Sequence, residues 1–241
     1  MEKRNPPKAI FCWSGGKDSA YGLHKVLMEN RYEIKYLLTT LNDNFRRISM
    51  HGVQEILLDQ QAEAIGIPLL KVWVTEGTNE EYEKKMEAVL LKAKSEGIHH
   101  VLFGDIFLDD LKAYRERNLA KVDMKGIFPL WQMDTEKLLD DFINKKFKSI
   151  ICCTNDMLGA AWLGREINRS FRKKLPEDID PCGENGEYHS FCYDGPLFKN
   201  KINFTIGEKV YKELAIKTGN SSSIQSPAAG FWFCDLLPEK E

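Results

Sequence analysis

The sequence predicts an α/β protein, in which a five-stranded parallel sheet with helices on both faces is followed by a smaller α+β domain. Apolar, β-branched runs alternate with helical patterns through the first half of the chain, as in parallel sheets. From Pro176 onward this alternation is lost, and loops and short strand-like runs take its place. We therefore expect two domains, residues 1–131 and 132–241.

The strands expected in the first domain are 8–13, 34–41, 67–74, 99–106 and 127–131, and its helices are 18–29, 53–65, 79–95 and 108–122. Gly66 stops the second helix, and Asn79 is the expected N-cap of the third. Parallel sheets bind ligands beyond the carboxyl ends of their strands. Four segments should therefore converge there: the loop 14–19, Thr39 to Asn44, Thr75–Glu76 and Gly104–Asp105.

In the second domain, Thr135 is the expected cap of a helix over 136–144, and a second helix is predicted over 158–171. The expected strands are 148–154, 188–192, 202–206 and 231–236, and Ser221–Ser223 is the expected flexible loop. The apolar run Phe231–Phe233 either seals the domain core or forms a contact within a homo-oligomer. The core is favoured, because one short strand is easily covered within its own domain.

Composition narrows the class of protein. The 241 residues are 43% hydrophobic and 29% charged, which is typical of a globular protein. The net charge of -2 gives no electrostatic reason to expect a nucleic-acid partner. No apolar run reaches membrane-spanning length, and the N-terminus lacks an apolar signal segment, so we expect a cytoplasmic protein without a membrane partner. The six cysteines form no C-x-x-C pair and are expected to be free thiols.

The loop Ser14-Gly15-Gly16-Lys17-Asp18-Ser19 lies between the first strand and the first helix. Its glycines allow the backbone N–H groups to point into one concavity, and the following helix adds the positive end of its dipole. Lys17 adds a full positive charge, and Ser14 and Ser19 add hydroxyl donors. Asp18 would repel phosphates unless a cation lay between them, which points to Mg²⁺ with Asp18 as its protein ligand.

This S-G-G-x-D-S pattern resembles the pyrophosphate loop, or PP-loop, of the ATP pyrophosphatases, which cleave ATP between its α and β phosphates. The alternative is an ordinary glycine turn with a solvated lysine. The resemblance predicts ATP as ligand. The residues expected to bind it are Ser14, Gly15, Gly16, Lys17, Asp18, Ser19, Thr39, Gly104 and Asp105.

Three further features near this edge have two interpretations each. Asp105 is either a second carboxylate at the ligand or a helix N-cap, and the sequence does not decide between them. Arg115 or Arg117 can reach a phosphate, but we favour a solvated charged helix face. His51 can face the site, but a lone histidine is more often structural.

The densest polar cluster of the second domain contains Glu184, Asn185, Glu187 and His189. Alternation along a strand would place Glu187 and His189 on one face, where a carboxylate beside an imidazole can accept a proton or bind a metal. The alternative is an Asn185–Gly186 hairpin turn flanked by exposed charges, and physics alone gives the two equal weight.

Several segments together resemble the diphthine–ammonia ligase family, a branch of the N-type ATP pyrophosphatases within the PP-loop, adenine nucleotide alpha hydrolase-like superfamily. The segments are 14–19, 50–53, 103–106, 129–131 and 183–189. The string Gly-Glu-Asn-Gly-Glu-Tyr-His is the discriminating one, and Ser190 stands where the family usually has threonine. The resemblance implies a HUP-type, Rossmann-like nucleotide domain with a C-terminal domain that completes the cleft.

The resemblance also implies a reaction. ATP transfers AMP to a carboxylate and releases pyrophosphate, and ammonia then displaces AMP to leave an amide. The implied catalytic residues are Lys17, Asp18, Glu184, Asn185, Glu187 and His189. In characterised members the carboxylate is that of diphthine on elongation factor two, so that protein is the expected partner in an archaeon or eukaryote. A bacterial chain would use another acceptor, such as a small carboxylate.

Two rival classes share the loop. One is a tRNA-modifying or sulfur-inserting ATP pyrophosphatase, which would need a basic surface or paired catalytic cysteines. The other is a nucleotide-binding sensor without catalysis, against which the retained Lys17 and Asp18 argue.

Overall fold

Five parallel strands form the first sheet of the computed structural model, which describes residues 5–48, 51–75, 78–213 and 230–239. Their pairing gives the order β4–β2–β1–β5–β6. The strands are β1 (Lys8–Cys12), β2 (Glu33–Asn42), β4 (Leu69–Val74), β5 (His100–Leu102) and β6 (Lys125–Ile127). A two-residue antiparallel strand, β3 (Arg47–Ile48), pairs with the end of β2 and makes a sixth. The predicted fold class is confirmed, with this one addition.

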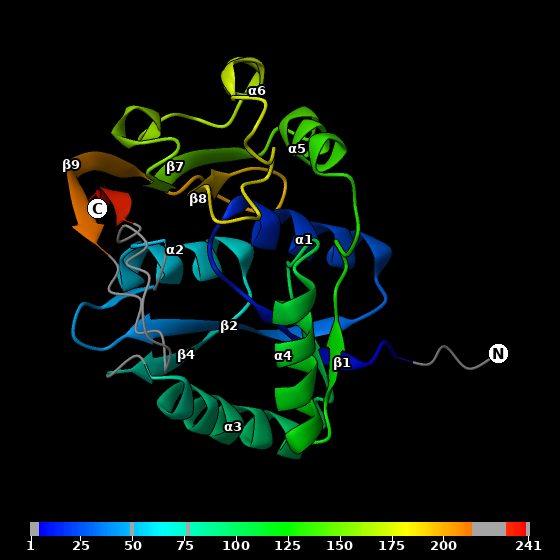
Figure 1. Ribbon diagram of the computed structural model, residues 1–241. Helices are drawn as coiled ribbons and strands as arrows, with labels where there is room; N and C mark the ends of the chain where they lie inside the picture. Colours follow the sequence, from blue (N-terminus) through cyan, green and yellow to red (C-terminus); the bar gives the residue numbers. More distant parts are fainter. Residues whose placement is uncertain (1–4, 49–50, 76–77, 214–229, 240–241) are drawn as a thin grey trace.

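Helices cover both faces of this sheet (Figure 1). α1 (Lys17–Glu29) and α2 (Glu55–Ile65) lie on one face, and α3 (Asn79–Ser95) and α4 (Asp109–Lys121) lie on the other. The strands alternate accordingly: Phe11 of β1 belongs to the core shared with α1 and α2, whereas its neighbour Ile10 belongs to the core with α3 and α4.

A second, antiparallel sheet has the order β8–β7–β10–β9. It consists of β7 (Lys148–Asn155), β8 (Tyr188–Asp194), β9 (Phe204–Glu213) and β10 (Gly230–Pro238), accompanied by α5 (Thr135–Asn144) and α6 (Arg169–Lys174). α1 and α2 lie between the two sheets, so one apolar core joins both halves of the chain (Figure 1). The run Phe231–Phe233 forms part of β10, between β7 and β9, and Trp232 packs against that core.

The predicted helix 158–171 is wrong. In its place the structure has a 3₁₀ turn, Ala160–Trp162, and the short α6. Gly159 and Gly164 adopt positive φ angles of 66° and 77° and interrupt the helical path.

Other predicted boundaries shift for local reasons. The strand expected over 127–131 ends at Ile127, because the chain turns at Pro129 and Gln132 adopts a φ of 57°. The N-caps of α3 and α5 are Thr78 and Asp134, each one residue before the expected cap, and their side chains accept backbone N–H groups. The predicted loop Ser221–Ser223 lies outside the described residues, as do Met50 and Glu76.

In the described part of the chain, we find no helix that combines the length and apolar character needed to cross a bilayer.

Candidate active site

A cavity of about 580 Å³ lies at the carboxyl ends of β1, β2 and β5 and is closed by the start of β8. The loop after β1 and Gly104 after β5 both line it, as expected of strand ends at the point where the strand order reverses. Thr39 does not line it. The neighbouring Thr40 does, and Thr39 is buried with its hydroxyl unpaired.

Hydrogen bonds from neighbouring elements fix the conformation of the glycine loop. Gly15 adopts a φ of 76°, and a Cβ there would lie 2.7 Å from Gln61 Oε1. Gln61 Nε2 donates to the carbonyl of Gly15 at 2.9 Å, and Trp13 Nε1 donates to Gln61 Oε1 at 2.8 Å. The N–H of Cys192 donates to the same Gly15 carbonyl at 2.8 Å. The fully buried Gln61 therefore fixes the turn, and no sequence pattern singled it out.

The serines of the loop are paired with each other, and the backbone of the loop is paired with the second sheet. Ser14 Oγ lies 3.2 Å from Ser19 Oγ and accepts the N–H of Gly16 at 3.3 Å. The N–H of Lys17 donates to Ser190 Oγ of β8 at 3.2 Å. The two halves of the chain thus meet at the first turn of α1.

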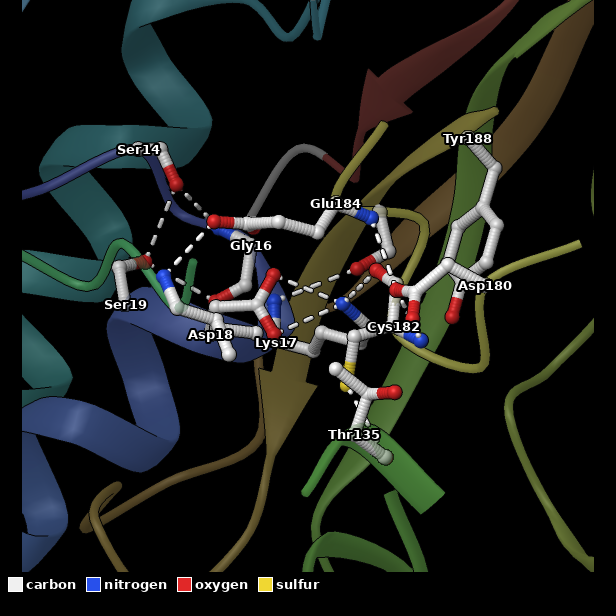
Figure 2. A network of polar contacts seen from close by, with 12 residues as sticks. Ser14, Gly16, Lys17, Asp18, Ser19, Thr135, Asp180, Cys182, Glu184 and Tyr188 are labelled. Carbon is white, nitrogen blue, oxygen red and sulfur yellow. Dashed lines mark hydrogen bonds and ion pairs between the residues drawn. The ribbon is translucent and has the colours of Figure 1, made fainter. Parts of the chain in front are cut away.

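The Lys17 ammonium is buried rather than solvated, with 2% of the residue exposed. It donates to both oxygens of the Asp18 carboxylate at 2.8 and 2.7 Å and to the carbonyl of Cys182 (Figure 2). It also lies 5.2 Å from the centre of the Tyr188 ring. Burial disfavours the charged amine, but the Asp18 carboxylate together with Tyr188 and Cys182 outweighs this and holds the pKa of Lys17 above its ordinary value. A glycine turn with a solvated lysine is therefore wrong.

The loop that carries the second polar cluster is held by hydrogen bonds between its own side chains and its own backbone. Asp180 Oδ2 accepts the N–H groups of Cys182 and Glu184 at 2.9 and 3.0 Å. Glu187 Oε1 accepts the N–H of Asp180 at 3.0 Å and Asn185 Nδ2 at 3.1 Å. Glu187 is buried, Asn185 is exposed, and neither lines the cavity.

The predicted pairing of Glu187 with His189 on one strand face is wrong, because β8 begins only at Tyr188. The hairpin alternative is also wrong. Residues 184–187 form a turn, but no strand precedes it. Glu187 is a scaffold residue of the loop, and His189 faces the cavity.

Glu184 reaches back to the first domain. Its Oε1 accepts the N–H of Ile106 at 2.7 Å and that of Phe107 at 3.4 Å, just beyond β5. Burial and the nearby Asp18 charge raise the pKa of Glu184 to about 7. A cavity-lining carboxyl group with such a pKa can exchange a proton near neutral pH.

Two histidines lie together in the cavity wall, although the sequence favoured a structural role for His51. The rings of His51 and His189 have centroids 4.7 Å apart, and His51 Nδ1 lies 3.1 Å from the carbonyl oxygen of Ser190. Burial lowers the pKa of His51 to about 4, and burial and His51 lower that of His189 well below its ordinary value. Both rings are therefore neutral at pH 7. His189 Nε2 is buried without a hydrogen-bond partner.

Asp105 forms an ion pair with Arg115, with an Nε–Oδ2 distance of 2.6 Å. The N-cap of α4 is Leu108, so the helix-cap interpretation of Asp105 is wrong. Arg115 lines the cavity, lies 4.4 Å over the Phe103 ring and has only 23% of its side chain exposed, which contradicts the predicted solvated face.

Asp18 can serve as a single carboxylate ligand. Its side chain is 27% exposed and lines the cavity. Within the described residues, no three acidic, histidine or cysteine side chains are arranged as a metal cluster. Mg²⁺ needs no such cluster when phosphate oxygens and water complete its shell, so this donor set fits it.

All six cysteines are free, as predicted. Cys152 is buried in β7, and burial raises its pKa well above the ordinary value. This is the opposite of what a reactive thiolate needs.

Comparison with known families and proteins agrees with the motifs. The diphthamide synthase N-terminal domain matches residues 7–126, and the diphthamide synthase C-terminal domain matches residues 134–220. The chain is 27% identical to the diphthine–ammonia ligase of Rattus norvegicus, with 82% of each chain covered. It is 26% identical to the human protein of the same name, with 78% of this chain and 79% of the relative covered.

Proposed function

The chain belongs to the diphthamide synthase family, and from this premise we propose that it is an ATP-dependent, AMP-forming amide ligase. It adenylates a carboxylate and amidates the product with ammonia. The acceptor we propose is diphthine, which is part of the names of the relatives. We propose that it is presented on elongation factor two in the cytoplasm. The observation that carries the proposal is the meeting of the glycine loop with Glu184 and His189 in one cavity.

In the first step an acceptor carboxylate oxygen attacks the α phosphorus of ATP. The bond between the α phosphorus and the oxygen that bridges the α and β phosphates breaks. Negative charge then collects on the departing pyrophosphate. The N–H groups at the start of α1 and the Lys17 ammonium are donors for that charge. Ser14, Gly16 and Gly104 provide a surface that a phosphate chain can approach closely.

When bound, Mg²⁺ supplies positive charge to the phosphates, and Asp18 is the residue that would hold it. Asp105 is already neutralised by Arg115, and we assign this pair to nucleotide positioning.

In the second step ammonia forms a bond to the acyl carbon, AMP leaves with the electrons of the C–O bond, and the nitrogen loses a proton. We assign Glu184 as the acceptor of that proton, since its pKa of about 7 suits the task. The neutral His189 presents an unpartnered nitrogen to the same cavity for orienting the acceptor. Residues 1–131 thus serve the nucleotide, and residues 132–241 serve the acceptor and ammonia.

The test is to incubate the protein with ATP, ammonium and a diphthine-bearing elongation factor two, and to separate the nucleotide products. We expect AMP, pyrophosphate and one amide per AMP. ADP would contradict the chemistry, and tight ATP binding without turnover would favour a sensor. AMP formation only with a small carboxylate would retain the ligase and replace the acceptor.

A further inference from the structure

We infer that the position now filled by the Lys17 ammonium is the binding site for the substrate ammonium ion. The site consists of the Asp18 carboxylate, the Cys182 carbonyl oxygen and the face of the Tyr188 ring, and we call it the ammonium cage (Figure 2). A carboxylate, a carbonyl oxygen and an aromatic face are the three kinds of group that hold an ammonium group. The inference rests on the proposed function, which makes ammonia a substrate.

The cage is built before any substrate arrives. The N–H of Cys182 is fixed by Asp180 at 2.9 Å, and the Tyr188 hydroxyl donates to the Pro181 carbonyl at 2.6 Å. At Gly183, which has a φ of 68°, a Cβ would lie 2.8 Å from the Tyr188 ring. The loop thus holds the Cys182 carbonyl and the Tyr188 ring in place around the Lys17 ammonium.

Nucleotide binding is expected to draw the Lys17 ammonium out of the cage. Lys17 is the first residue of α1, and its flexible four-carbon stem starts where the N–H groups of the helix attract a phosphate. Once its ammonium moves to the pyrophosphate, the cage loses its positive charge. Asp18 lies within electrostatic range of both Asp180 and Glu184, so these carboxyl groups lose a neighbouring cation when Lys17 moves.

A small monovalent cation restores that balance, and ammonium reproduces the head group that has just left. The Cys182 carbonyl and the Tyr188 ring remain available to it even where Asp18 faces a metal ion. Ammonium bound there lies near Glu184 in the same cavity wall. Glu184 takes one proton from the ammonium ion to give the ammonia that attacks, passes it to water, and then takes the second proton once the C–N bond has formed. The arrangement also orders the reaction, because ammonium enters only after the nucleotide has drawn Lys17 away.

The first test uses a Lys17→Met variant without nucleotide, in which the ammonium group that fills the cage is absent. We expect ammonium and Rb⁺, which is of nearly the same size, to raise its melting temperature by about 3–6 °C at tenfold the dissociation constant. Na⁺ at equal ionic strength should not. The wild type and the control Lys25→Met, altered at a surface lysine of α1, should show no ammonium-specific shift. An equal response of Lys17→Met to Na⁺ and ammonium, or none, overturns the inference.

A second test does not depend on that variant's folding. Crystals of the wild type with a non-hydrolysable ATP analogue and Rb⁺ should show anomalous density between the Cys182 carbonyl and the Tyr188 ring. Lys17 still bound to Cys182 in that complex would overturn the inference. Neither test needs turnover, so a failed ligase assay with a filled cage would reject the proposed function alone. AMP formation with an empty cage would reject the ammonium site alone.

Discussion

The glycine loop 14–19 and the polar loop 180–190 meet in one cavity but are built differently. The first is a junction between a strand and a helix, and its shape comes from backbone pairing and the buried Gln61. Its polar side chains line the cavity, although Lys17 is paired with Asp18 there and Ser14 with Ser19. No strand directly precedes the second, and Asp180 and Glu187 accept N–H groups of its own backbone. The residues of this segment that line the cavity are Gly183, Glu184, Tyr188, His189 and Ser190.

A dense polar cluster therefore contains residues that hold its loop in shape as well as residues that face a ligand. Two carboxylates three residues apart have opposite tasks here. Glu187 is buried under the loop and holds it, whereas Glu184 crosses the cavity to β5 and has a raised pKa. Substitutions in the two loops should therefore separate activity from stability.

The largest effect is expected at Lys17. In Lys17→Met the charge that stabilises departing pyrophosphate is lost, so AMP formation should fall roughly 10²–10³-fold. Pyrophosphate release at saturating ATP measures this, with Lys25→Met as the matched control. A loss of less than tenfold would show that Lys17 does not stabilise the departing pyrophosphate.

The next effect is expected at Glu184. Glu184→Gln keeps the oxygen that accepts the Ile106 N–H but cannot accept a proton, so turnover at pH 8 should fall about 10²-fold. The ratio of wild-type to variant rate should rise as pH increases through about 7, where wild-type Glu184 ionises. Taking the ratio cancels the change in free ammonia. A ratio that does not change with pH would remove Glu184 as base.

Glu184→Gln should also change stability, with a defined sign. The folded pKa of about 7 exceeds the ordinary value of 4.5, so ionisation of Glu184 disfavours the folded state. The wild type should lose stability relative to the variant as pH rises from about 4.5 to 7, with no further change above. Urea unfolding at several pH values measures this. A difference in unfolding free energy between wild type and variant that stays constant from pH 4.5 to about 7 would contradict it.

Glu187→Leu should unfold more easily, because it leaves the N–H of Asp180 without an acceptor. We expect a loss of about 1–3 kcal/mol in the free energy of unfolding. Below the melting temperature, turnover per folded molecule should stay within tenfold of wild type. A Glu187→Leu variant that is folded but inactive would show that Glu187 takes part in the reaction rather than only holding the loop.

The smallest effect is expected at Asn185, which is exposed and makes one side-chain hydrogen bond to Glu187. Asn185→Ala should change the free energy of unfolding by about 0.5 kcal/mol or less and leave turnover within about twofold. Steady-state kinetics and a melting curve suffice. A large loss of turnover with intact stability would instead indicate contact with substrate.

The sequence by itself determined what depends on local chemistry. The strand–glycine–helix order specified the anion-binding loop, since Gly15 requires a positive φ that few other residues adopt. The alternation of strands and helices specified the parallel sheet and the edge at which ligands bind. The short elements of the second half were harder, because single glycines such as Gly159 end a helical path that periodicity alone continues.

Tertiary structure alone decided which side chains meet. Thr39 and Thr40 are indistinguishable by sequence, because a parallel strand buried on both faces carries no polar alternation to show which of them points to the cavity. His51 and His189 are far apart in the chain, and so are Gln61 and Gly15; each pair meets only when the second sheet and α2 pack against the glycine loop. Such contacts depend on packing between elements, which local patterns of residues do not encode.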